Sequence, residues 1–320
     1  MEQFQDGHHV RLRSRQTGTY LHADDDGRRV SLSRRRASMN EAWAVHLFQP
    51  PQAQVRYLLL HSAAYGRYLA STDAPAPRGH SGLRVEQCDY EPWEEEAIRW
   101  QAVGVDSGND VLLRNVAGRL RANGRYLSVD DFNSTGTMMH WVVERIPARN
   151  DAPRLAAPTG LRLPRSLAFV LPWRVIQYEQ EGAEESNVGF AWESLVFRGR
   201  SAYHLRKELA SRLGVAMDVS NLVMCVRAGM HGRLTPLVVD LPHSRETLDI
   251  IVVMAGTPVR TWELSAHSCS IRHLEYLHYA FCKGARSMQT NSGYIDEMMI
   301  PNSGCFTVHA ELQYPDVNAE

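Results

Sequence analysis

The chain has 320 residues, 44% of them hydrophobic and 22% charged, with a formal net charge of −1 at pH 7. This length favours two domains, each large enough to bury a core of its own. The near-zero net charge gives no overall attraction to nucleic acid or acidic membranes, so neither is an expected partner. No segment approaches the roughly 18 apolar residues of a membrane span, and the N-terminus lacks the apolar run of a signal peptide. These features predict a soluble, intracellular protein of the cytoplasm.

A threefold repeat occupies the first half of the chain. Its copies begin with Val10 to Ser14 and Gly18 to Ala23, with Leu58 to Ser62 and Gly66 to Ala70, and with Val111 to Asn115 and Gly118 to Ala122. Each copy later reaches a tryptophan, at Trp43, Trp100 or Trp141. The alternation of apolar and polar residues predicts strands with one buried face, and each glycine sits where a tight turn needs positive φ. Three such hairpins bury their apolar faces together when they close around a shared axis.

Three stretches of this region carry a resemblance to known proteins: HHVRLRSRQTGTYLHADDDGRRVSLSRRRAS, RYLLLHSAAYGRYLASTDAPAP and MMHWVVERIP. They resemble the β-trefoil of fascin-like actin-crosslinking domains and, more closely, a plant family of fascin-like proteins with a domain of unknown function. The resemblance covers Met1 to Pro147 and implies a β-trefoil over residues 1–149. The third copy departs from the pattern, because it is compressed between Tyr126 and Val129, where a longer loop and strand are expected.

The second half of the chain has a different pattern. Residues 150–164 are rich in proline and small side chains and are interpreted as a linker. Trp173 to Tyr178 and Trp192 to Phe197 predict a hairpin, and Ser201 is the expected N-cap of a helix that ends at Gly214. The predicted helix places Leu205, Leu209 and Leu213 on one face.

Three further strands are predicted at Leu222 to Val226, Leu237 to Val239 and Leu248 to Met254. The last is a nearly unbroken apolar run, which favours a central position in the sheet. A hairpin, a helix and then further strands is similar in element order to ubiquitin-like β-grasp folds. The whole chain is therefore expected to be mainly β, with an N-terminal β-trefoil and a smaller α+β, ubiquitin-like domain at residues 165–258.

Strand and helix periodicity disappears over residues 259–308, which contain Cys269, Cys282 and Cys305. The flanking segments are continuous when joined, with MAGTP running into HAELQYPDVNAE. We interpret this segment as an insertion, most simply a retained intron translated in frame, followed by a C-terminal strand or tail at residues 309–320. A genuine helix around Leu274 to Phe281 is the alternative.

No catalytic signature is present in the sequence. There is no glycine-rich phosphate loop between a strand and a helix, no G-x-S-x-G elbow and no C-x-x-C pair. Asp24 to Asp26 and Asp130 to Asp131 are interpreted as turn residues, and Tyr20 and Tyr68 as core packing. The sequence thus predicts a protein that is not an enzyme, with no cofactor, no metal site and free thiols.

Two functions are left open. The first is a protein-binding module, for which the fascin-like resemblance implies filamentous actin as partner. An arginine-rich strip suits an acidic filament surface, because guanidinium groups pair bidentately with carboxylates; its members are Arg11, Arg13, Arg15, Arg34, Arg35 and Arg36. Binding is expected before crosslinking, which needs two sites and leaves the oligomeric state as an open question. The alternative is a trefoil that binds a small ligand or carbohydrate and regulates stress or defence, although the Q-x-W motif of ricin-like trefoils is missing.

Overall fold

The computed structural model describes residues 3–50, 54–91, 95–105, 110–131, 136–149, 155, 171–180, 192–214, 219–229, 231–254 and 314–315. Met1–Thr257 and Gln313–Glu320 belong to one compact unit, which carries both predicted domains. The insertion interpreted at residues 259–308 lies outside the described residues, and so does the linker at 150–164 apart from Leu155. Among the described residues, no helix is long and apolar enough to cross a membrane.

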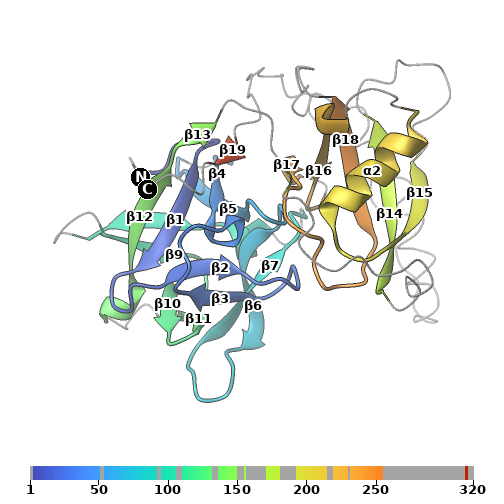
Figure 1. The fold of residues 1–320 in the computed structure, drawn as a ribbon. Coiled ribbons are helices and arrows are strands. Elements are labelled where there is room, and N and C mark those ends of the chain that lie inside the picture. The colour runs from blue at the N-terminus through green and yellow to red at the C-terminus, as the bar shows by residue number, and fades with distance from the viewer. Residues whose placement is uncertain are drawn as a thin grey trace, which may run out of the picture. The chain divides into compact units, whose positions relative to one another are not determined.

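The first domain is a 12-stranded sheet that closes on itself, because β1 pairs with β12 (Figure 1). Its strands are β1 (His9–Ser14), β2 (Tyr20–Ala23), β3 (Val30–Ser33), β4 (Trp43–Phe48), β5 (Tyr57–Ser62), β6 (Tyr68–Pro75), β7 (Leu83–Cys88), β8 (Gln101–Gly104), β9 (Asp110–Arg114), β10 (Arg119–Asn123), β11 (Tyr126–Asp130) and β12 (His140–Ile146). Short helical turns are η1 (Met39–Glu41), α1 (Glu95–Ile98) and η3 (Thr137–Met139).

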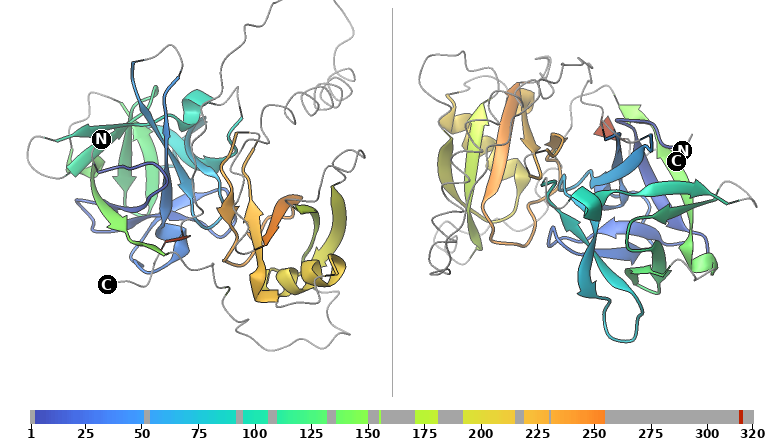
Figure 2. Two further views of the ribbon diagram at one scale, coloured as in Figure 1. Left: turned by 90° about the horizontal axis from the view of Figure 1, so that it is seen from above. Right: turned by 180° about the vertical axis from the view of Figure 1, so that it is seen from behind.

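Six of these strands form a closed barrel, in the order β1, β4, β5, β8, β9, β12 and back to β1. The other six form the three hairpins β2–β3, β6–β7 and β10–β11. The hairpins contact one another, since β7 pairs with β11 and the amide of Leu32 donates to the carbonyl of Arg125 at 3.0 Å. A barrel of six strands with three hairpins is a β-trefoil, as the repeat predicts (Figure 2).

The three tryptophans of the repeat occupy equivalent positions. Each is fully buried, and each indole Nε1 donates to a carbonyl of a hairpin strand. Trp43 donates to Leu21 at 3.2 Å, Trp100 to Leu69 at 2.8 Å, and Trp141 to Leu120 at 3.1 Å. Each tryptophan therefore fixes its hairpin to the barrel wall, while its ring fills the common core. The prediction that Tyr20 and Tyr68 pack in the core is also confirmed, because both are buried.

The compressed third copy still forms a complete hairpin. Strands β10 and β11 pair over their full length, from Arg119 opposite Asp130 to Asn123 opposite Tyr126. Only two residues connect them, and the first, Gly124, has a φ of +62°. Positive φ at this position is what a two-residue hairpin turn requires, so glycine allows the short connection.

The second domain is a 5-stranded sheet in the order β15-β14-β18-β16-β17, with α2 against one face (Figure 1). Its elements are β14 (Trp173–Gln180), β15 (Glu193–Arg198), α2 (Ala202–Arg212), η5 (Val219–Asn221), β16 (Leu222–Val226), β17 (Thr235–Pro236) and β18 (Leu248–Met254). The predicted hairpin, helix and central strand β18 are all confirmed. Ser201 caps the helix by accepting from the His204 amide, and Leu205 and Leu209 are buried against the sheet.

The strand predicted at Leu237 to Val239 is wrong. The structure instead places a two-residue strand, β17, at Thr235–Pro236, where Val226 pairs with Thr235 and Cys225 with Pro236. Pro236 has no amide hydrogen and therefore cannot continue the ladder as a donor. Leu237 still donates its amide to Met224 at 2.8 Å and is buried, which explains why its segment is apolar without being a strand.

The polypeptide after β16 contacts the trefoil. The Tyr90 amide donates to the carbonyl of Ala228 at 2.9 Å, and the His231 amide donates to the carbonyl of Tyr90 at 3.3 Å. Gly229 lies between these bonds with a φ of +77°, and a Cβ there would come within 2.6 Å of the Tyr90 carbonyl oxygen. A second contact joins β13 (Ala148–Arg149) to β19 (Tyr314–Pro315), a two-residue strand within the predicted C-terminal segment.

Candidate functional site

The carboxylate of Glu144 forms ion pairs with two members of the arginine strip that the sequence predicts. Arg13 Nε donates to Glu144 Oε1 at 2.8 Å, and Arg36 Nε lies 3.2 Å from Oε2. The Tyr20 hydroxyl donates to the same carboxylate at 3.3 Å. Burial acts to raise the pKa of Glu144, but the hydrogen bonds and charges of Arg13 and Arg36 outweigh it and hold that pKa below its ordinary value. Two of the predicted arginines are thus already neutralised within the trefoil.

Of two more predicted arginines, Arg11 is buried and Arg15 already has a carboxylate partner. Arg11 is only 2% exposed on β1, directly opposite Glu144 of β12. Burial and then the charge of Arg36 lower the pKa of Arg11. Arg15 is exposed, but its Nε lies 3.4 Å from a carboxylate oxygen of Asp110. An incoming acidic surface would have to compete with these internal partners.

Arg34 and Arg35, directly after β3, are exposed. Arg125, in the β10–β11 turn, is also exposed and lies against β3 through its carbonyl bond to Leu32. Among the described residues, none forms an ion pair with these three side chains. We call Arg34, Arg35 and Arg125 the basic patch. The patch combines two predicted arginines with Arg125, which becomes their neighbour only when the hairpins assemble.

An exposed aromatic pair lies at the end of the same β10–β11 hairpin. Tyr126 is 49% exposed, and its ring centroid lies 5.3 Å from that of His80 in the loop between β6 and β7. Ser81, the residue after His80, donates to Asp130 at 3.2 Å and accepts from Arg121 at 3.2 Å. We call Tyr126 and His80 the aromatic pair. It presents an apolar ring face beside a hydrogen-bonded group of polar side chains.

Sequence reasoning missed Tyr126. The sequence Gly-Arg-Tyr-Leu occurs at Gly66 to Leu69 and again at Gly124 to Leu127. The second occurrence looks like another copy of the turns that bury Tyr20 and Tyr68. The structure instead shows that Leu120, which accepts from Trp141, is the equivalent of Leu21 and Leu69. Tyr126 therefore begins the second strand of its hairpin and points outward. The preceding Gly118-Arg119-Leu120 already completes the repeat, and that is the signal that could have shown it.

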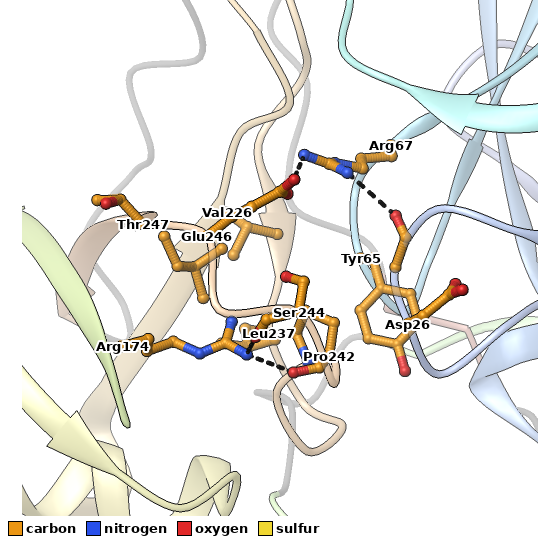
Figure 3. Close-up of a pocket in the computed structure, with 12 residues that line it drawn as sticks. Asp26, Tyr65, Arg67, Arg174, Val226, Leu237, Pro242, Ser244, Glu246 and Thr247 are labelled. Atoms are coloured by element: carbon orange, nitrogen blue, oxygen red, sulfur yellow. Dashed lines mark hydrogen bonds and ion pairs between the residues drawn. The ribbon is translucent and has the colours of Figure 1, made fainter. Parts of the chain in front are cut away.

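A small cavity lies between residues of the trefoil and of the second domain (Figure 3). Tyr65 and Arg67 line it from the trefoil, and Arg174, Pro242 and Glu246 line it from the other domain. Arg174 donates to the carbonyls of Pro242 and Ser244, and Arg67 lies 3.4 Å from Glu246. The cavity volume is about 40 Å³, enough for only a few water molecules. Arg67 and Glu246 pair across the two domains, whereas Arg174 bonds within its own domain. A cavity of this volume leaves no room for a small-molecule ligand.

Two histidines lie beside the segment that follows β16: His61 is buried and His46 is half-buried. His61 Nδ1 is 3.3 Å from Thr235 Oγ1, and His46 Nδ1 is 3.2 Å from the Tyr68 hydroxyl. Burial, with a smaller contribution from Arg233, lowers the pKa of His46 to about 3. Burial likewise brings the pKa of His61 well below its ordinary value. These imidazoles are neutral at physiological pH and act as packing groups at the contact between the domains.

The acidic turn at Asp24 to Asp26 has the structural role that the sequence predicts. The same prediction is wrong for Asp130, which ends strand β11 and forms an ion pair with Arg121. Asp26 Oδ1 accepts from the amides of Arg28 and Arg29, at 3.0 and 2.8 Å, which closes the turn between β2 and β3. Among the described residues, no group of three histidine, cysteine or acidic side chains is placed to hold a metal ion. In the part of the chain that the structure describes, neither Cys88 nor Cys225 forms a disulfide bond.

Two protein families match the chain. Residues 1–128 match the family described as a beta-trefoil domain of unknown function, DUF569, and residues 172–253 match the DUF569 associated ubiquitin-like domain. The two matched regions lie in the order trefoil and then ubiquitin-like domain. The predicted order of a trefoil family of unknown function followed by a ubiquitin-like fold is thereby confirmed. Among curated proteins, none matches the chain.

Several solved structures are similar to part of this chain at low sequence identity. An SDF2-like protein from Arabidopsis thaliana is 17% identical, with 44% of this chain and 93% of that chain covered and a TM-score of 0.37. SeviL bound to asialo-GM1 saccharide is 14% identical, with 43% and 96% covered and a TM-score of 0.33. The BEL beta-trefoil is 14% identical, with 44% and 95% covered and a TM-score of 0.36.

Proposed function

We propose that this DUF569 protein is a non-catalytic binding protein whose trefoil contacts an acidic protein surface through the basic patch. The observation that carries the proposal is the exposure of Arg34, Arg35 and Arg125 without a carboxylate partner among the described residues. Unpaired guanidinium groups on one surface attract carboxylates of a partner and orient them through bidentate hydrogen bonds. The fascin-like resemblance implies filamentous actin as the partner.

Several arginines of the strip predicted from the sequence are already paired or buried, so the proposed binding surface is smaller than that strip. Arg13 and Arg36 share Glu144, and Arg11 is buried beside them. Removing such groups from their partners to bind a filament would leave a half-buried carboxylate uncompensated. The proposed contact therefore rests on the basic patch, with Arg36 at its border. One patch per chain supports binding, whereas bundling of filaments needs a second site.

The experiment is co-sedimentation of the full chain with filamentous actin across a salt series. We expect saturable binding that weakens with salt, and an affinity reduced about tenfold by the double substitution Arg34→Ala and Arg35→Ala. The matched control is Arg78→Ala with Arg245→Ala, which removes the same charge from two other exposed positions. No association at low salt would exclude actin as the partner, and equal losses in both double variants would exclude the basic patch.

A second candidate function is saccharide binding at the aromatic pair. Tyr126 presents an exposed ring face, and the Ser81, Arg121 and Asp130 network supplies polar groups on the same hairpins. Aromatic rings stack on the apolar faces of sugars, and adjacent polar groups then fix their orientation. A glycan array probed with the full chain tests this function. We expect binding that Tyr126→Ala abolishes and Trp173→Ala, at an exposed aromatic of the other domain, leaves intact; no signal above background would exclude it.

A further inference from the structure

The ubiquitin-like sheet has two unlike edges within the described part of the chain. On one side, β17 is two residues long and contains Pro236, which shortens and interrupts the edge. On the other side, β15 pairs with β14 in an unbroken register over six residues, without a bulge. Native sheets protect their edges with proline, bulges, lysine or short strands, because unpaired backbone groups attract another strand. Strand β15 has no proline, bulge or lysine, and its two charged residues, Glu193 and Arg198, are confined to its ends.

The exposed face of this edge is apolar at its centre. Val196 of β15 is 62% exposed, and its neighbour across the hairpin is Val175. Trp173, also on β14, is 51% exposed on the same face. The opposite face of β15 carries Leu195 and Phe197, which are buried in the core under α2. A strand added to β15 would therefore extend both the exposed valine row and the core.

We propose that β15 pairs with β15 of a second copy of this chain, antiparallel, around a twofold axis perpendicular to the sheet, with Val196 opposite Val196. Residues directly opposite each other in an antiparallel ladder point to the same face. In this register the row across the dimer is Val175, Val196, the second copy's Val196 and its Val175. Leu195 lies opposite Phe197 on the core face, and Ser194 lies opposite Arg198 at each end.

The sequence of β15 favours this register over its neighbour. Moving the axis to Leu195 would place Val196 opposite Ser194 and Phe197 opposite Glu193. That arrangement opposes a carboxylate to a core aromatic and breaks the valine row. A register with the axis between Leu195 and Val196 is excluded, because opposite residues would then point to different faces. The net charge of −1 adds little repulsion between two copies.

The dimer would supply what bundling requires. Each copy carries one basic patch, so a pair of chains carries two, without any second actin site on one trefoil. Dimer formation does not depend on actin binding, and its test needs no filament. A failed dimer test would therefore leave the proposed actin contact intact, and the converse also holds.

The first test measures the mass of the full chain in solution by light scattering across a concentration series. We expect a concentration-dependent rise toward twice the chain mass of 36.2 kDa. Val196→Glu places two carboxylates face to face on the axis and is expected to give a monomer at every concentration. Ser194→Glu is the matched control: it adds the same charge to the same face of β15, but opposite Arg198, and is expected to preserve or strengthen the dimer.

The second test uses oxidation of single cysteine variants, with the native cysteines left in place. In the proposed register, Val196→Cys faces its own copy and is expected to give a covalent dimer on a denaturing gel. Ser194→Cys, on the same strand and face, lies about four residues of strand length from its copy, roughly 13 Å, and is expected to stay uncrosslinked like the native chain. A wild-type monomer at all concentrations, dissociation by both glutamates, or equal crosslinking of both cysteines would overturn the proposal.

Discussion

The trefoil and the ubiquitin-like domain differ in whether their sheets close or end in edge strands. The trefoil pairs its first strand, β1, with its last, β12, so its barrel has no free edge. The ubiquitin-like sheet ends at β15 and β17 in the described part of the chain. A closed sheet satisfies its backbone groups internally, whereas an open one depends on what lies beside it. The comparison teaches that two domains with buried cores of their own can differ in whether the described strands leave a sheet edge open.

The largest expected effect comes from the tryptophans that fix the trefoil hairpins. Trp43→Ala, Trp100→Ala and Trp141→Ala each remove a fully buried indole and its hydrogen bond. We expect each to lower the free energy of unfolding by about 3–5 kcal/mol, measured by urea denaturation followed by circular dichroism. Trp173→Ala, at a half-exposed position on the open sheet, is the control and should cost about 1 kcal/mol or less. Comparable losses at Trp173 would contradict the contrast between the domains.

The next effect concerns the contact between the two domains. Gly229→Ala would introduce a Cβ 2.6 Å from the Tyr90 carbonyl oxygen at a φ of +77°. We expect a loss of about 1–3 kcal/mol, seen as separation of one thermal transition into two in calorimetry. Gly214→Ala has a similar φ of +65° but no atom within 4 Å of its Cβ, and so measures the backbone strain alone. Identical behaviour of the two variants would show that the contact at Tyr90 contributes nothing.

A pH titration addresses two histidines of the trefoil whose pKa values are lowered, His9 and His46. Burial lowers the pKa of His9 to about 4 and of His46 to about 3, from an ordinary value of 6.5. Because the unfolded chain binds these protons first, stability is complete above pH 6.5 and falls as the pH decreases toward the lowered folded values. We expect a loss of up to about 1.4 kcal/mol per pH unit for each such histidine. Urea titrations between pH 6.5 and 5 should show a shallower slope for His46→Gln, and an unchanged slope would contradict the buried, neutral state of His46.

The smallest expected effect is at Glu144. Its contribution to stability is present above the ordinary carboxyl pKa and is lost as the pH falls through its lowered folded pKa. Because the ion pairs are partly exposed and screened, Glu144→Gln should cost less than about 1 kcal/mol at neutral pH. The substitution releases Arg13 and Arg36, so it should strengthen co-sedimentation with actin. Glu208→Gln, on the exposed face of α2, controls for net charge, and equal strengthening in both variants would mean that no specific release occurs.

Much of the fold was predictable because its signals are local or repeated. The Gly turns and tryptophans mark three copies of one hairpin unit, and the closed sheet follows from the need to bury three similar faces. Ser201 and the spacing of Leu205 and Leu209 predict α2 by the same local rules. The strand predicted at Leu237 to Val239 is wrong because an apolar segment can be buried by tertiary packing without forming a strand, as Leu237 is.

The candidate site was less predictable because exposure and pairing depend on residues distant in sequence. Arg13 and Arg36 are neutralised by Glu144, which is more than 100 residues away. Arg125 joins Arg34 and Arg35 only through contact between two hairpins of different repeats. Tyr126 carries the same local motif as buried tyrosines, yet it is exposed, because the repeat was already complete at Leu120.

The sequence by itself determined the two domain types, the threefold hairpin unit, the positions of its tryptophans and the strand and helix order of the second domain. Periodicity, turn residues and capping act over a few neighbouring residues, so they can be recognised from the sequence alone. Only the tertiary structure decided which arginines are exposed, which sheet edge is unprotected and where the ubiquitin-like domain meets the trefoil. Burial, ion pairing and strand order are set by residues far apart in the chain, so they exist only once the chain has folded.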